Sequence, residues 1–297
     1  PILHCHLHQC IMLNKRNFLK SLLLLGTIPF TTKAKNILDE IPEEIKNKKP
    51  DDFWLQIRND YILKPDYINL ENGYFSMMAQ PVLEKYLADV RMINTEASYY
   101  MRTVQFEKKQ KVSDRLAEML GCAGDELIIT RNTTESLDTV ISGIDWKAGD
   151  EAIMAEQDYG SMLDMFKQQS KRYGLVQKII SIPFHPKSDE EIIALYENAI
   201  TPKTRLIMIC HIINITGQIL PIKKVCDMAH KKGVAVMVDG AHAVAHIDFK
   251  ISDLNCDYYG SSLHKWLGTP MGAGILYVRK DKIKTHWPIY AEYGFEG

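Results

Sequence analysis

Short runs of apolar residues alternate with longer stretches of helical periodicity from residue 53 onward. The apolar runs have the length of strands, and most are rich in Ile and Val: residues 126–130, 151–155, 176–183, 205–212, 234–239 and 274–278. Apolar residues at helical spacing occupy other stretches: residues 82–92, 107–120, 134–144, 161–173, 189–199 and 221–232. Continuous apolar strands that alternate with helices indicate a mostly parallel sheet with helices on both faces. We therefore expect an α/β fold.

The first 35 residues differ in composition from the rest of the chain. They contain no acidic residue and five basic ones, and an apolar run extends from Leu22 to Phe30. A basic segment before a short apolar run is typical of an export signal. The residues from Lys15 to Lys20 are similar to a twin-arginine signal with Lys in place of the first Arg. We expect a periplasmic or exported protein; the alternative is a cytoplasmic one in which this segment packs on the domain as a helix.

The residues before Met12 include three His and two Cys, which are residue types that bind zinc. Nothing around them suggests a folded metal module, so we interpret them as over-read from upstream of a true start at Met12 and predict no metal site. Residues 36–52 are rich in Lys, Glu, Asp and Pro, which suits a solvated linker. The predicted organisation is an upstream and signal segment (1–35), a linker (36–52) and one large domain (53–297).

Composition argues against three classes of protein. Lys and Arg number 36 against 37 Asp and Glu, and without residues 1–35 the net charge changes from −1 to −6, which does not suit a nucleic-acid binder. No apolar run reaches the roughly 20 residues that span a bilayer. Six cysteines in 297 residues do not make a disulfide scaffold, and those beyond residue 53 lie in or beside apolar runs. Composition therefore indicates a globular protein of the size of an enzyme and goes no further.

Polar segments follow several of the predicted strands. Ligands bind at the carboxyl ends of the strands in sheets of this kind, so the chemistry is expected there. The glycine-rich motifs of dinucleotide-binding and phosphate-binding loops are absent from the sequence. The polar segments at the expected strand ends are residues 130–136, 156–160, 211–214, 238–243 and 260–266.

These segments contain the groups that pyridoxal 5′-phosphate (PLP) requires of a protein. The cofactor needs a lysine for its Schiff base and an anion near its pyridine nitrogen, which Lys265 and Asp239 would supply. His242 and Asn214 are candidate donors to its phenolate oxygen, and Tyr159 offers a ring to stack on the pyridine.

A phosphate site is predicted from the same segments. Thr133 and Thr134 begin an expected helix, whose first N–H groups and dipole favour an anion. Ser262 and His264 are close to the lysine in sequence and would complete the phosphate cup.

Together these pieces resemble the class V aminotransferase family of fold-type I PLP enzymes. The resemblance is nearest to isopenicillin N epimerase-like proteins and more distant to cysteine desulfurases, and it covers residues 53 to about 293. The matching pieces, in order, are residues 72–74, 98–100, 133–136, 158–160, 214–222, 239–242, 262–267 and 270–274.

The resemblance implies a PLP-dependent enzyme that acts at the α-carbon of an amino acid through a Schiff base on Lys265. Transferase, epimerase and lyase chemistry remain open, because the substrate pocket decides among them. The alternatives are a cysteine desulfurase or selenocysteine lyase-like enzyme, or a catalytically incomplete PLP-binding fragment. The family also implies a homodimer, and a smaller C-terminal domain that this sequence largely lacks. The expected fold is therefore a fold-type I large domain.

Overall fold

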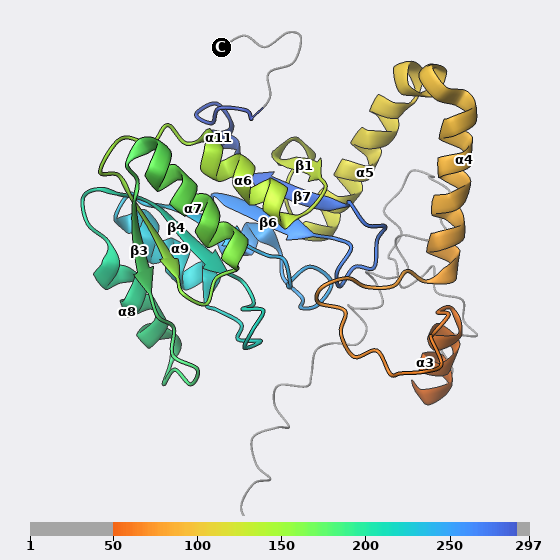
Figure 1. Cartoon of the computed structure of the whole chain (residues 1–297), viewed down its shortest axis with the longest axis horizontal. Helices are drawn as coiled ribbons and strands as arrows, with labels where there is room; N and C mark the ends of the chain where they lie inside the picture. The colour runs from red at the N-terminus through yellow and green to blue at the C-terminus, as the bar shows by residue number, and fades with distance from the viewer. Residues whose placement is uncertain (1–49, 290–297) are drawn as a thin grey trace, which may run out of the picture.

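Seven strands form one mixed sheet in the part of the chain that the structure, a computed structural model, describes, namely residues 50–289 (Figure 1). Five strands pair in parallel in the order β6-β5-β4-β2-β3, while β7 runs antiparallel to both β6 and β1. The mostly parallel sheet expected from the sequence is confirmed. The strands are β1 (Leu127–Thr130), β2 (Glu151–Ala155), β3 (Val176–Ile180), β4 (Thr204–Cys210), β5 (Ala235–Asp239), β6 (Tyr258–Ser262) and β7 (Gly274–Val278).

Helices pack on both faces of the sheet, since its central strands are apolar on both sides. In β4, Ile207 and Ile209 face one hydrophobic cluster, and Leu206 and Met208 face the other. Side chains alternate along a strand, so an uninterrupted apolar run supplies both cores. The first cluster includes residues of α5 (Gln105–Leu120), α8 (Asp189–Ala199), α9 (Ile222–Lys231) and α10 (Ile251–Leu254); the second includes residues of α6 (Thr133–Gly143) and α7 (Gly160–Tyr173).

A pair of helices extends beyond the β1 edge of the sheet (Figure 1). This pair is α4 (Gln80–Thr103), interrupted by a left-handed φ of 44° at Ala97, followed by α5. Tyr100 is the buried residue of α4, whereas Tyr99 and Phe106 are exposed. Among residues 50–289, no helix has both the length and the apolar character to cross a bilayer. The remaining elements are α3 (Pro50–Asn59), the 3₁₀ turn η2 (Gly124–Glu126) and α11 (Lys280–Ile283).

The N-terminal predictions fall largely outside the described residues. The export-signal segment (1–35), the His and Cys residues before Met12 and most of the predicted linker lie there. Helix α3 begins at Pro50, so the last three residues of the predicted linker are helical.

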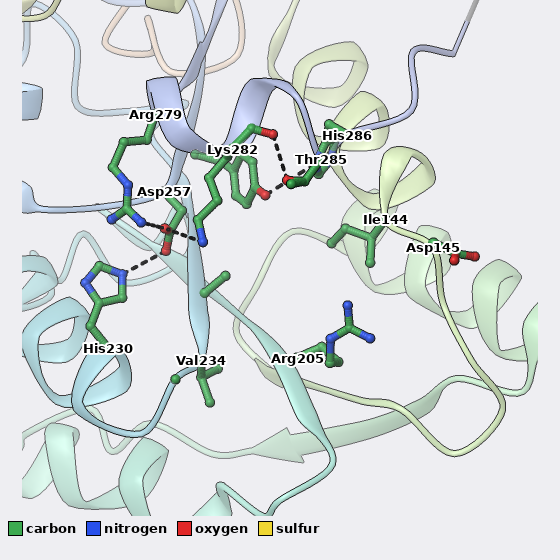
Figure 2. Close-up of a pocket in the computed structure, with 13 residues that line it drawn as sticks. Ile144, Asp145, Arg205, His230, Val234, Asp257, Arg279, Lys282, Thr285 and His286 are labelled. Atoms are coloured by element: carbon green, nitrogen blue, oxygen red, sulfur yellow. Dashed lines mark hydrogen bonds and ion pairs between the residues drawn. The ribbon is translucent and has the colours of Figure 1, made fainter. Parts of the chain in front are cut away.

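A buried carboxylate joins several elements at the amino-terminal edge of the parallel strands. Asp257 accepts hydrogen bonds from the Val236 backbone N–H (2.7 Å) and His230 Nε2 (2.8 Å). It also pairs with Arg279 (2.7 Å) and Lys282 (3.6 Å), in the wall of a cavity of about 400 Å³ (Figure 2). Because Asp257 is fully buried and meets donors from the start of β5, the end of α9 and the chain after β7, we interpret this network as structural.

Candidate active site

A cavity of about 860 Å³ lies at the opposite edge of the sheet, where the parallel strands have their carboxyl ends. Its wall comes from the segments that follow β1, β2, β4, β5 and β6, together with residues 70–75. The structure therefore brings together side chains that are far apart in the sequence. All the residues predicted to form the site line this cavity: Thr133, Thr134, Tyr159, Asn214, Asp239, His242, Ser262, His264 and Lys265.

Lys265 and Asp239 are both held in the low-dielectric floor of the cavity. Asp239 ends β5, is 4% exposed, and accepts a hydrogen bond from the Ala241 backbone N–H at 3.0 Å. Burial raises the pKa of Asp239, opposed by that N–H and by Lys265. Burial lowers the pKa of Lys265, opposed chiefly by Asp239 and Glu71. The arrangement offers a lysine that loses its proton more readily than a surface lysine.

His242 lies between Lys265 and an indole ring. Its Nε2 is 3.3 Å from Lys265 Nζ, and its Nδ1 accepts a hydrogen bond from Trp266 Nε1 at 3.2 Å. Burial lowers the pKa of His242 to about 4, with further contributions from Lys265 and His246. The imidazole is therefore neutral at pH 7 and can donate through one ring nitrogen while accepting through the other.

The start of helix α6 is preorganised for an anion. Asn132 caps the helix, its side chain accepting the Glu135 N–H at 2.8 Å. The Thr133 N–H donates to Ser262 Oγ at 2.9 Å, and the two hydroxyl oxygens are 2.8 Å apart. A Cβ at Gly274 would lie 2.7 Å from the Asn132 backbone, so glycine permits this close approach. In this structure the Thr133 and Glu135 N–H groups are engaged by Ser262 and Asn132. This turn therefore offers a phosphate the Thr133 and Ser262 hydroxyls, the Thr134 N–H and the helix dipole.

The other predicted residues line the cavity with fewer fixed contacts. His264 Nδ1 lies 3.2 Å from the Ala273 carbonyl oxygen and donates a hydrogen bond to it, which holds the imidazole ring in place. Tyr159 is 45% exposed, and Asn214 is also exposed where it lines the cavity. Both side chains are thus accessible to a bound molecule.

The structure adds residues that the sequence did not identify. Trp266 and Glu71 line the cavity, as does the buried Cys210 at the end of β4. The segment that carries Glu71 is anchored across the site by a 3.0 Å hydrogen bond from the Ser76 N–H to the His264 carbonyl oxygen. Trp266 directly follows the lysine, and this adjacency was the signal available for it; Glu71 lies in an extended segment with no periodicity.

Comparison with known proteins places this site in a family. The sequence model described as Aminotransferase class-V matches residues 75–292. The chain belongs to the class V aminotransferase family, which confirms the resemblance and the expected fold class.

Curated relatives fall into groups with different activities. The isopenicillin N epimerase of Amycolatopsis lactamdurans is 29% identical over 245 residues, which are 82% of this chain and 61% of the relative. A cysteine desulfurase of Haloferax volcanii is 32% identical over 180 residues, 59% of this chain and 41% of the relative. The chain thus spans about 61% of the length of the epimerases that it matches.

Solved structures share the fold. The complex of the cystine C–S lyase C-DES with its product cysteine persulfide aligns with a TM-score of 0.69 at 25% identity, covering 75% of this chain and 60% of that one. A C-DES mutant with glycine covalently linked to its PLP cofactor aligns with a TM-score of 0.73 at 24% identity, covering 80% of this chain and 63% of that one.

Proposed function

We propose that this chain is a PLP-dependent enzyme that acts at the α-carbon of an amino acid, with Lys265 as the residue that holds the cofactor. The observation that carries the proposal is the convergence of Lys265, the buried Asp239 and the capped start of α6 on one cavity. The cavity volume of about 860 Å³ lies within the usual range for small-molecule sites. The family and the PLP-containing C-DES structure support the same cofactor.

The residues present fit each part of this cofactor. When bound, PLP supplies an aldehyde that condenses with amines and a ring that draws electrons from the α-carbon. Asp239 would keep a proton on the ring nitrogen, because a carboxylate in a dry site stabilises a nearby cation strongly. The α6 start and Ser262 would hold the phosphate, with His264 beside them. Of the remaining side chains, His242 and Asn214 would donate to the phenolate oxygen, and Tyr159 would stack on the ring.

Lys265 would have two roles in the reaction. Its uncharged amine would be the group that holds the cofactor. Nζ would also serve as the base that takes the proton from the substrate α-carbon and returns one. Burial favours the uncharged form that both roles need.

Epimerase-like or transaminase-like chemistry is favoured over desulfurase chemistry by two observations. The match to the isopenicillin N epimerases extends over 82% of the chain, against 59% for the Haloferax desulfurase. In the described part of the chain, the cysteine that lines the cavity is Cys210, and burial raises the pKa of its thiol well above the ordinary value. A nucleophilic cysteine needs a low pKa and access to solvent.

Cofactor binding tests the first part of the proposal. Purified protein mixed with PLP is expected to develop the visible absorbance of a lysine-linked cofactor, and Lys265→Ala is expected to lose it. Lys167→Ala, which removes an exposed lysine outside the cavity, is the matched control and should retain the absorbance. Equal absorbance in the wild type and Lys265→Ala would refute the assignment.

The reaction is identified by incubating the loaded protein with amino acids in D₂O. Deuterium at the α-carbon with formation of the other enantiomer indicates epimerisation, and a 2-oxo acid indicates transamination. Release of sulfide from cysteine indicates the desulfurase alternative. No exchange with any amino acid, in a protein that binds the cofactor, would support the alternative of an incomplete PLP-binding fragment.

A further inference from the structure

Three side chains beside the cavity form a continuous chain of polar contacts. Trp266 Nε1 is 3.2 Å from His242 Nδ1, and His242 Nε2 is 3.3 Å from Lys265 Nζ. The indole is held in place by His246, whose ring stacks on it with centroids 3.9 Å apart and an interplanar angle of 13°. His246 Nδ1 is in turn 2.9 Å from the His242 carbonyl oxygen. The indole ring is therefore positioned by the same turn that carries His242.

Hydrogen-bond donors and acceptors along this chain allow one arrangement of protons. An indole N–H can only donate, so His242 Nδ1 must accept. A neutral imidazole that accepts at one nitrogen carries its proton on the other, and His242 is neutral because burial holds its pKa near 4. The proton is then on Nε2, which faces Lys265 Nζ. An ammonium group has no lone pair, so Lys265 can accept this hydrogen bond only as an uncharged amine.

We propose that Trp266 is a positioning residue that fixes the proton of His242 on Nε2 and thereby keeps Lys265 uncharged. This inference rests on the proposed function, in which Lys265 reacts as an uncharged amine. The same tautomer leaves a donor at Nε2, as the proposed role toward the phenolate oxygen requires. Trp266 itself acts through His242.

Other groups around Lys265 favour the opposite state. The negative charges of Asp239 and Glu71 raise its pKa, as does Cys210, whereas burial lowers it. Burial lowers the pKa of the His242 imidazole, and the charges of Lys265 and His246 lower it further, so these groups favour the neutral ring. Without the indole N–H, His242 could carry its proton on Nδ1 and accept from a lysine ammonium through Nε2. Removing Trp266 is therefore expected to move Lys265 toward its charged form.

The tautomer can be measured directly in the protein without cofactor. Nitrogen-15 NMR of labelled histidine distinguishes a protonated ring nitrogen from an unprotonated one, and His242→Gln identifies the signal by its loss. We expect His242 to carry its proton on Nε2 in the wild type. A proton on Nδ1 in the wild type would overturn the inference, and this measurement does not depend on whether the proposed function is right.

The consequence for Lys265 is measured from the pH dependence of its reaction with PLP, followed by visible absorbance. Trp266→Phe keeps an aromatic ring for His246 to stack on but removes the donor. We expect the midpoint of this pH dependence to rise by about one pH unit in Trp266→Phe. At pH 7 this corresponds to about a tenfold loss in the rate of the reaction with PLP. Trp287→Phe, at an exposed indole outside the cavity, is the matched control and should leave the midpoint unchanged.

A double-mutant cycle separates this role from a structural one. An amide side chain has no tautomer to fix, so the effect of Trp266→Phe should disappear in the His242→Gln background. An effect that persists in that background would contradict the inference, because Trp266 would then act by packing alone. An unchanged tautomer and an unchanged midpoint in Trp266→Phe would contradict it as well.

Discussion

At the residue scale, burial determines the chemistry of the site. Asp239, His242 and Lys265 all have pKa values displaced chiefly by desolvation, and in each case the displacement opposes the charged form. Charges brought into such a place by a ligand interact more strongly than they would at the surface. A charged ligand group in this cavity would therefore interact strongly with these side chains.

Replacing Asp239 by Asn tests its proposed role toward the cofactor ring. The amide can still accept the Ala241 N–H, but it carries no charge to stabilise a proton on the ring nitrogen. We expect exchange of the substrate α-proton to slow by about 10²–10³-fold, the usual effect of removing one electrostatic contact in a dry site. The measurement is deuterium incorporation by NMR, and exchange at the wild-type rate would contradict the role.

Asp158 gives a pH dependence of stability. Burial raises its pKa from the ordinary 3.8 to about 7, although it accepts the Ala155 N–H. Between pH 4 and 7 the native state therefore binds more protons than the unfolded state, and the free energy of unfolding falls as the pH rises. In Asp158→Asn the free energy of unfolding, measured in urea, should fall less between pH 5 and pH 8 than in the wild type. Parallel curves for the two proteins would contradict the assignment.

At the element scale, most strand ends and helix starts were predictable to within two residues, but β6 (Tyr258–Ser262) was not among the predicted strands. Helix α9 was expected at residues 221–232 and is observed at Ile222–Lys231, because Pro221 and Gly233 delimit it. The strand expected at 176–183 ends at Ile180. The antiparallel placement of β7 between β1 and β6 was not predictable, since no local pattern specifies which strands become neighbours.

The cap of helix α6 links an element to the site. Asn132→Ala removes the acceptor for the Glu135 N–H and should cost about 1 kcal/mol of stability. Because the same turn is proposed to hold the phosphate, affinity for PLP should fall more than affinity for pyridoxal. Ser188→Ala, at an N-cap whose side chain accepts no helix N–H, is the control. Equal losses of affinity for PLP and for pyridoxal would show that the start of α6 does not bind the phosphate.

The amino-terminal edge of the sheet should contribute to stability without touching the site. Asp257→Ala leaves the Val236 N–H without its buried partner. It also leaves His230 and the cationic Arg279 and Lys282 without theirs (Figure 2). We expect a loss of about 3 kcal/mol in urea unfolding, since one member of a buried pair is removed. Asp281→Ala, which removes an exposed partner of Arg279, should cost at most about 1 kcal/mol. Similar losses of unfolding free energy in the two variants would contradict a structural role for the buried network around Asp257.

At the scale of the whole molecule, the positions of the chemical groups were predictable because parallel strands bring their carboxyl ends to one edge. Asp239 ends a parallel strand that the apolar pattern predicted, so its place at this edge followed from the pattern. Lys265 follows β6, which was not among the predicted strands, so its place in the shared cavity was predicted from the polar segment 260–266 and the family resemblance. The contacts between groups were not predictable. The hydrogen bond from Trp266 to His242 and the approach of Glu71 depend on side-chain rotation and on the path of an aperiodic segment.

Three large apolar side chains outside the sheet are mostly exposed. Leu70, Tyr99 and Phe106 are 88%, 69% and 70% exposed, on the segment before α4 and on the α4–α5 pair. We propose that a second copy of this chain covers them. Light scattering should give twice the 34.0 kDa of the chain, and Tyr99→Asp with Phe106→Asp should give the single mass. Phe184→Asp, on the loop after β3, should leave the dimer intact; a wild-type monomer would contradict the proposal.

The covalent position of the cofactor is the most direct measurement of the central claim. Protein loaded with PLP is reduced with borohydride, which makes a lysine linkage permanent, and is then digested for peptide mass spectrometry. We expect the added mass on the peptide that contains Lys265 and an unmodified peptide at Lys167. Attachment at another lysine, or no attachment to a protein with the native fold, would contradict the proposed function.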